Sequence, residues 1–259
     1  MSYETIQVAI KDRIAVVTLD RPPMNPLNSR VFRDLVRAAD EFQVDNSVKV
    51  VIISGSGNKA FAAGADVSEM ATLTPVEAHY FCQGSKIAFS KLENLSKPVI
   101  AAINGIAFGG GCELALSCDF RIAADTAKFS FPETGLGIIP GGGGTQRLPR
   151  LIGTTRAKEL MFFGDVIDPN FAEKIGLVNK VVPADSLMDE TMKMAEKLVS
   201  KPLVALQMAK AAINAGGNVD ITSGLDIEIL NFVTAFASAD GREGISAFVE
   251  KRKPSYIDR

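Results

Sequence analysis

The chain has 259 residues, of which 47% are hydrophobic and 22% charged, and its net charge is −2 at pH 7. This is the composition of a globular protein, and its acidic balance argues against a general nucleic-acid binder. Three cysteines with no C-x-x-C pair argue against a disulfide framework or a structural zinc site, so we expect a reducing compartment and a cytoplasmic protein. No apolar run is long enough to span a membrane, and residues 1–11 lack a targeting pattern.

Short apolar runs alternate with helical patterns in the first half of the chain. The runs predict strands at Ile6–Ile10, Ile14–Leu19, Val48–Ile53, Val99–Ile103 and Phe120–Ala124. Asn28 or Ser29 is expected to begin one helix. Pro75 is expected to begin a second helix, with an apolar side formed by Val76, Tyr80, Ala88 and Leu92. Alternating strands and helices predict an α/β fold with a parallel sheet and crossover helices.

The last third of the chain is mainly helical. Helices are predicted at Arg156–Phe163, Asn170–Ile175, Asp185–Val199, Leu203–Ala215 and Ile221–Ala239, with one strand at Leu177–Val182. We therefore expect a core of residues 1–195 and a helical region of residues 196–259, which together form one functional unit. The apolar stripe of the last helix has no sheet to cover, so it must pack on the first half of the chain or against other subunits, and we expect the latter. The stripe consists of Leu225, Ile229, Phe232 and Phe236.

The single histidine of the chain, His79, lies in a predicted helix. A lone histidine without a positioned partner is more often an exposed or locally paired side chain than a catalyst. Nucleophilic hydrolysis by a Ser-His-Asp or Cys-His site is therefore disfavoured, as is a histidine-based metal site.

Three glycine-rich segments stand out, at Phe61–Asp66, Asn104–Glu113 and Pro140–Arg147. None is followed by the G-K-[ST] of a Walker loop, and none has the register of a dinucleotide-binding fingerprint. The second segment follows a buried strand and leads into the apolar helical run Cys112–Cys118. Gly109–Gly111 would then lie at a helix N-terminus, where unpaired amides and the helix dipole can hold a developing oxyanion.

Two glutamates are candidates for proton transfer. Glu113 lies one helical turn after Gly110 among apolar neighbours, and burial raises the pKa of a carboxyl group. The alternative for Glu113 is a buried ion pair with Arg121 or Arg147. Glu133 stands where a strand ends and a glycine-rich loop begins, and its alternative is an ordinary charge at a helix N-terminus. Two neighbouring carboxyl groups can divide the work, one taking a proton from water and the other giving a proton to carbon.

Four segments in a fixed order share features with one known family. They are Phe61–Asp66, Ser96–Asp119, Phe131–Arg147 and Ala247–Lys253. These segments resemble, respectively, the oxyanion loop, the signature, the second-glutamate segment and the C-terminal tail of the enoyl-CoA hydratase (crotonase) family. The resemblance extends along essentially the whole chain. It implies a crotonase-like spiral of ββα units followed by a C-terminal helical trimerisation region.

The resemblance implies a role for each matching position. The amides of Ala65 and Gly110 would bind a thioester oxygen, and Glu113 and Glu133 would be the two catalytic acids. The positions implied to contact coenzyme A (CoA) are Met24, Leu27, Ala63, Ala65, Asp66, Val67, Ser68, Phe248 and Lys251. In the family, the positions that match Phe248 and Lys251 act across a subunit boundary. Met24 and Ser68 stand where many members have lysine, so phosphate contacts would be fewer on that side.

The implied activity is the hydration of a trans-2-enoyl-CoA to a 3-hydroxyacyl-CoA. No metal or redox cofactor is expected, since the thioester supplies the activation and CoA is part of the substrate. The expected partners are copies of the same chain, in a homotrimer or a dimer of trimers. Two alternatives remain: an isomerase that moves the double bond with one glutamate, and a non-catalytic member that binds acyl-CoA or RNA. Which glutamate is the base and which the acid also remains open.

Overall fold

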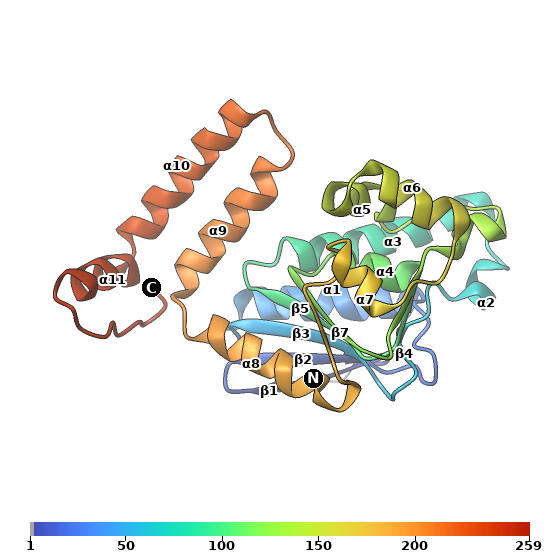
Figure 1. Ribbon diagram of the computed structural model, residues 1–259, viewed down its shortest axis with the longest axis horizontal. Coiled ribbons are helices and arrows are strands. Elements are labelled where there is room, and N and C mark those ends of the chain that lie inside the picture. Colours follow the sequence, from blue (N-terminus) through green and yellow to red (C-terminus); the bar gives the residue numbers. More distant parts are fainter. Residues whose placement is uncertain (1–2) are drawn as a thin grey trace.

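The computed structural model describes residues 3–259, and Met1 and Ser2 lie outside the described residues. The chain folds into two sheets with helices packed around them, followed by a projecting helical arm (Figure 1). The strands are β1 (Ile6–Lys11), β2 (Ile14–Leu19), β3 (Val50–Gly55), β4 (Ala60–Ala62), β5 (Val99–Ile103), β6 (Ile106–Phe108), β7 (Phe120–Ala124), β8 (Lys128–Ser130) and β9 (Lys180–Val182). The α-helices are α1 (Ser29–Val44), α2 (Val67–Met70), α3 (Pro75–Glu93), α4 (Gly110–Leu116), α5 (Gly144–Ile152), α6 (Thr154–Phe163), α7 (Pro169–Lys174), α8 (Leu187–Val199), α9 (Leu203–Gly216), α10 (Ile221–Ala237) and α11 (Ala239–Val249). Two short 3-10 helices are η1 (Pro132–Leu136) and η2 (Ala184–Ser186).

The larger sheet has six strands in the order β1-β2-β3-β5-β7-β9. Strand β1 is antiparallel to β2, and each of the remaining neighbours is parallel. The smaller sheet has the order β4-β6-β8 and is parallel. The pairs β3/β4, β5/β6 and β7/β8 each give one strand to each sheet, and α3 or α4 separates one pair from the next. The predicted parallel sheet with crossover helices is confirmed, and this repetition is a spiral of ββα units.

Both faces of the central strands of the large sheet are buried. One face carries Ile52, Ile100 and Ile122, which pack with Leu187 and Ala195 of α8. The other face packs in the main core with the smaller sheet and helices α1, α3 and α4. Burial on both sides explains why these strands have continuous apolar sequences rather than alternating ones.

Helix α1 begins where the sequence predicts. The side chain of Asn28 accepts hydrogen bonds from the amides of Arg30 and Val31, which satisfies two amides of the first turn. Pro75 is the first residue of α3, as predicted, and Thr74 caps this helix. The predicted apolar side of α3 is wrong at Val76 and Tyr80, which are exposed. The residues of α3 that face the core are Phe81, Ser85, Ala88, Phe89 and Leu92.

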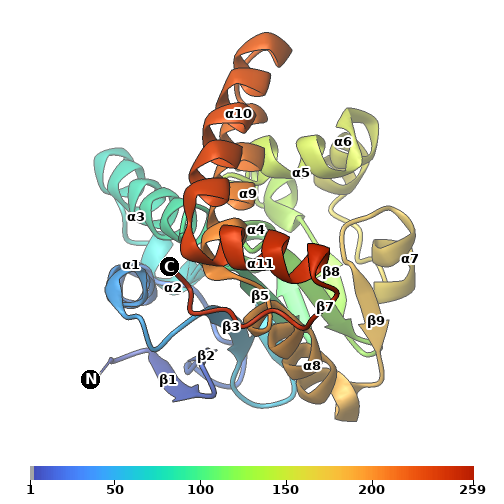
Figure 2. The ribbon, with the colours of Figure 1, turned by 90° about the vertical axis from the view of Figure 1, so that its left-hand side faces the viewer.

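Helices α9, α10 and α11 form the arm, which leaves the body after α8 (Figures 1 and 2). The helix predicted at Ile221–Ala239 is α10, which ends at Ala237 because Ser238 is extended and its side chain caps the next helix, α11. The C-terminal tail ties the arm to the body. Asp258 accepts hydrogen bonds from the Lys49 ammonium group at 2.7 Å and from the Leu203 amide at 2.8 Å. Residue 195 lies within α8, and the division of the chain after it stays a prediction.

Within residues 3–259, none of the helices combines the length and apolar character that crossing a membrane requires.

Candidate functional site

The smaller sheet gathers the candidate residues from three distant parts of the chain. Ala65 follows β4, Gly110 follows β6 and Glu133 follows β8, in each case within a few residues of the strand end. The three strands are parallel neighbours, so their carboxyl ends lie at one edge of the sheet. This edge is where ligands bind in parallel α/β folds.

The amides of Ala65 and Gly110 lie close together at this edge. A Cβ atom added to Gly110 would lie 3.4 Å from the Ala65 nitrogen. Gly110 is the first residue of α4, so its amide has no acceptor within the helix. Among residues 3–259, the Ala65 amide donates to no main-chain acceptor. Two adjacent unpaired donors form a site for an oxyanion.

Gly109 lets the loop after β6 pass beside the second glutamate. Its φ angle is 48°, in the left-handed region that glycine adopts easily, and a Cβ there would lie 2.6 Å from Glu133 Oε1. Any side chain at this position would therefore be strained and would displace the carboxyl group. The glycine both allows the turn into α4 and leaves room for Glu133.

Glu113 is buried, with 4% of its surface exposed, and its carboxylate is held by a loop. Its Oε1 atom accepts hydrogen bonds from the amides of Gly142 at 2.8 Å and Gly144 at 2.7 Å. Burial raises the pKa of Glu113, while these amides and the positive charge of Arg147 act in the opposite direction. Burial is the larger effect, so the pKa lies above its ordinary value.

The alternative of a buried ion pair at Glu113 is wrong for both arginines. Arg121 donates to main-chain carbonyl groups, among them Leu177 O at 2.8 Å. Arg147 pairs with Glu93 at 2.7 Å. In the part of the chain that the structure describes, Glu113 forms no ion pair within 4.0 Å. Its main-chain donors stabilise its charged form, and the charge of Arg147 adds to this from a greater distance.

Glu133 has the opposite surroundings. It lies in the first turn of η1, as expected for an ordinary charge at a helix N-terminus. However, it is only 9% exposed, and its Oε2 atom is buried without a hydrogen-bond partner in the described chain. Burial raises its pKa from 4.5 to about 7, and the negative charge of Glu113 adds to this effect. A carboxyl group with this pKa exchanges its proton near neutral pH, which suits a general acid or base. An exposed charge at a helix terminus would not have this property.

A sequence profile described as Enoyl-CoA hydratase/isomerase matches residues 9–259. The chain belongs to the enoyl-CoA hydratase/isomerase family. It is 46% identical over 260 residues to the crotonyl-CoA hydratase of Syntrophomonas wolfei, with all of both chains covered. It is 45% identical to the short-chain-enoyl-CoA hydratase of Clostridium acetobutylicum, covering 98% of this chain and 97% of that one.

Solved structures of the family have the same fold. The enoyl-CoA hydratase of Bacillus anthracis superimposes with a TM-score of 0.95 at 41% identity, covering 99% of this chain and 100% of that chain. An enoyl-CoA hydratase structure from Geobacillus kaustophilus gives a TM-score of 0.97 at 33% identity, covering 100% and 98%. The predicted crotonase-like fold and the resemblance to this family are therefore confirmed.

The CoA positions implied by the enoyl-CoA hydratase/isomerase family fall into two groups. The first group lines the loop beside the two amides. The Ala63 amide donates to Met24 O at 2.9 Å, which joins the proline-rich turn to the loop after β4. Val67 and Ser68 are exposed on the first turn of α2. These residues border the candidate site from one side.

Two members of this first group have structural contacts of their own. Leu27 is buried, and its side chain lies 3.4 Å from where a Gly110 Cβ would stand. Asp66 forms an ion pair with Arg21 at 2.9 Å and caps α2 through the Ser68 amide. Leu27 and Asp66 therefore hold the loop that presents the Ala65 amide, and the Leu27–Ala65 bridge joins this loop to the proline-rich turn.

Phe248 and Lys251 form the second group, on the arm. Phe248 is 85% exposed at the end of α11, and Lys251 follows the helix with a φ angle of 56°. Figure 1 shows α11 at the opposite end of the molecule from α2. Within one chain, Phe248 and Lys251 therefore lie far from the group beside the two amides. This arrangement is compatible with the expectation that they act across a subunit boundary.

Sequence reasoning identified the third glycine segment of this family member without giving it a function. The structure shows that its Gly142 and Gly144 amides hold Glu113. The signal was the run of four glycines itself, because main chain without side chains can approach a carboxylate closely. His79 is exposed, and its ring lies 3.5 Å from the Gln83 side chain and edge-on to Tyr80, as expected for an exposed or locally paired histidine.

Proposed function

We propose that this chain is an enoyl-CoA hydratase, which adds water reversibly to a trans-2-enoyl-CoA and gives a 3-hydroxyacyl-CoA. One observation carries the proposal: two buried carboxyl groups with opposite hydrogen-bonding surroundings border a pair of unpaired amides. Relatives that match the chain over their full length are named for the same reaction.

The amides activate the substrate. The thioester oxygen accepts hydrogen bonds from the Ala65 and Gly110 amides, which draw electron density from the conjugated double bond and leave C3 electrophilic. Donors fixed in advance stabilise the enolate-like transition state without reorganisation during the reaction. The thioester thus supplies the activation, and the proposed reaction needs no metal or redox cofactor.

The two glutamates move the protons. Glu113, held as a carboxylate by Gly142 and Gly144, takes a proton from water while the water oxygen bonds to C3. The electrons of the double bond shift toward the thioester, and Glu133 gives its proton to C2. One proton is gained and one lost across the pair, and exchange with water restores both groups.

The alternatives make different use of the acids. An isomerase that moves the double bond needs one glutamate, so one of the two buried carboxyl groups would have no role in it. A non-catalytic member that binds acyl-CoA or RNA needs neither acid, and the acidic composition of the chain disfavours RNA. Keeping two buried carboxyl groups without catalytic use would be destabilising.

The test is direct, and crotonyl-CoA is the first substrate to use because one relative carries its name. A hydratase removes the absorbance of the conjugated enoyl thioester and forms 3-hydroxybutyryl-CoA, which mass spectrometry identifies by the added water. An isomerase instead creates this absorbance from a 3-enoyl-CoA. Binding without any absorbance change would reject the proposal in favour of a non-catalytic member.

The wider setting forms part of the same proposal. We propose a cytoplasmic enzyme of fatty-acid metabolism, such as β-oxidation, assembled as a homotrimer or a dimer of trimers. The support is the exposed apolar surface of α10, which carries Leu225, Ile229, Phe232 and Phe236. In such an assembly Phe248 and Lys251 of one subunit complete the CoA site of another.

A further inference from the structure

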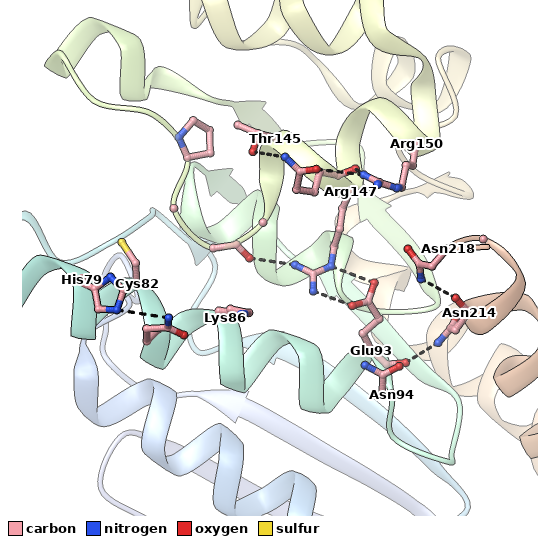
Figure 3. A pocket seen from close by; sticks show the side chains of 17 residues that line it. His79, Cys82, Lys86, Glu93, Asn94, Thr145, Arg147, Arg150, Asn214 and Asn218 are labelled. Atoms are coloured by element: carbon pink, nitrogen blue, oxygen red, sulfur yellow. Dashed lines mark hydrogen bonds and ion pairs between the residues drawn. The ribbon is translucent and has the colours of Figure 1, made fainter. Parts of the chain in front are cut away.

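The loop that holds Glu113 is itself held from its other side. This loop, Gly141–Gly144, directs two amides at Glu113. Its residues Gly141–Gly143, together with Arg147, line a cavity of about 640 Å³ (Figure 3). Glycine main chain has the greatest conformational freedom, and Gly143 has a φ angle of 113°. Such a segment keeps two amides directed at one oxygen atom only if something else fixes it.

Arg147 provides this fixation. Its Nη1 atom donates to Gly142 O at 3.0 Å, across the loop from Glu113. Its Nε and Nη2 atoms donate to the two carboxylate oxygens of Glu93, at 3.0 and 2.7 Å. A guanidinium group bound at two atoms by a carboxylate has little freedom to rotate. Glu93 thus orients Arg147, and Arg147 fixes the peptide that follows Gly142.

The ends of this chain of contacts are anchored in different elements. Glu93 is the last residue of α3, where its main-chain carbonyl accepts a hydrogen bond from Asn214 of α9 at 3.0 Å. Arg147 belongs to α5, which begins within the glycine loop. The side chains of Arg147 and Glu93 are 16% and 35% exposed, so water competes little for the guanidinium group.

We propose that Arg147 and Glu93 are positioning residues, which clamp the Gly141–Gly144 loop so that its amides stay on the carboxylate of Glu113. The inference rests on the proposed function, in which Glu113 is the base. Neither residue touches the substrate, and both act through the loop. Losing the clamp frees the two amides and removes a nearby positive charge, and both changes disfavour ionised Glu113.

The charged and titratable groups that face Glu113 come from several elements. Arg147 of α5 favours its ionised form, while Glu133 of η1 opposes it when ionised. Cys82 of α3 and Cys112 of α4 stay protonated, because burial raises the pKa of both thiols and the Glu113 charge adds to this. Arg147 is therefore the cation whose removal raises the pKa of Glu113.

Arg147→Met should move the acid limb of the pH profile of kcat/KM upward by about one pH unit, the lower end of what a neighbouring charge and its hydrogen bonds produce. Below this limb kcat/KM should fall roughly tenfold, and it should recover at higher pH. Arg147→Lys keeps the charge but loses the bidentate hydrogen bonds to Glu93, so a smaller shift of the acid limb in the same direction is expected. Glu93→Gln should also give a smaller shift, because Arg147 keeps its charge but loses its anchor.

Arg150→Met is the matched control. Arg150 lies on the same helix and lines the same cavity, but its Nη1 atom donates to Gln146 O of its own helix. The substitution removes the same charge from α5 without touching the glycine loop. The acid limb should stay in place, which separates the clamp from a general electrostatic effect.

An infrared titration of the carboxylic-acid C=O band tests the clamp without using activity, with Glu113→Gln identifying the Glu113 signal. The proposal predicts that this signal titrates about one pH unit higher in Arg147→Met than in wild type or Arg150→Met. If the wild-type protein lacked hydratase activity, the proposed function would fail while this titration still decided the clamp. An unchanged titration with a uniform loss of kcat at every pH would reject the clamp. If Arg147→Met does not fold, Arg147→Lys and Glu93→Gln decide the same question.

Discussion

Replacing Glu133 by glutamine separates what this residue does for catalysis from what it does to stability. The two side chains have nearly the same shape, but glutamine carries no charge at any pH. The pKa of Glu133 rises from an ordinary 4.5 to about 7 in the folded protein, mainly because of burial. The folded protein therefore holds this proton more tightly than the unfolded chain does.

The sign of the stability effect follows from this difference. A group whose folded-state pKa is raised contributes its full stability below pH 4.5 and loses it as the pH rises through about 7. At ~1.4 kcal/mol per pKa unit, the rise corresponds to an upper bound of ~3.5 kcal/mol. Solvent near the open side of the site screens the charge, so we expect ~1–2 kcal/mol. Glu133→Gln avoids this loss and should be more stable than wild type by that amount in mildly alkaline solution.

Urea unfolding of both proteins at about pH 5 and about pH 8.5 measures this difference, with the subunit concentration held constant. The advantage of Glu133→Gln should be small at the lower pH and appear at the higher one. Its kcat should fall by ~10²–10⁴ with KM little changed, because proton donation to carbon is lost. Glu196→Gln, at an exposed position of α8, should change the free energy of unfolding by less than ~0.5 kcal/mol. A Glu133→Gln protein that is less stable at both pH values, or that keeps normal turnover, would refute the reasoning.

Four further results are expected. Glu113→Gln should lower kcat by ~10²–10⁴ in steady-state kinetics, and normal turnover would mean that Glu113 is structural. Gly110→Pro should lower kcat by ~10²–10³ or more, because one oxyanion donor is lost. Circular dichroism should show a folded protein, because proline is tolerated at the first position of a helix, and a folded, active variant would exclude this amide as the oxyanion donor. Lys251→Ala should raise KM for enoyl-CoA roughly tenfold by loss of a charge-assisted phosphate contact, and equal effects on a pantetheine thioester without phosphates would point to folding or assembly instead. Light scattering should give a particle several times the 27.6 kDa of one chain, and a 27.6 kDa particle at micromolar concentration would contradict the assembly.

The elements that were predictable are those with strong local signals. Helix α1 combines the Asn28 cap with apolar residues spaced for one buried face, and both features are found as expected. The central strands of the large sheet were recognisable because both of their faces are buried, with Ile52 and Ile100 in the cluster on one side and Val51 and Ala101 in the core on the other. In these segments local preference and tertiary burial favour the same structure.

The error at α3 has a geometric cause. Val76 and Tyr80 were grouped with Ala88 and Leu92 because these positions are multiples of four apart. Four residues rotate a helix by about 40° more than one turn, so a row of such steps moves steadily around the helix. By Leu92 the row has turned almost half-way from Val76, and only its later members face the core.

The smaller sheet could not be read from the sequence, although it positions the site. Its strands β4, β6 and β8 have three residues each, too few to show a period of two. Glu113 and Glu133 were identified from their sequence neighbours and from the family segments that contain them. The sequence held no local signal for the sheet that brings their loops together. The partner of each acid depends on contacts between residues far apart in the chain, such as Gly142 with Glu113.

The order of the strands in the smaller sheet also determines which parts of the site can change independently. The loop after β6 is central, so Gly109 and Gly110 contact both outer loops, and a substitution there disturbs the oxyanion donors and Glu133 together. The loop after β8 lies at one side of the sheet and the Ala65 loop at the other. Exchanging the segment that carries Glu133 would therefore alter the proton chemistry while leaving the two amides in register, which makes this outer loop the natural point for redesigning the reaction of the enzyme.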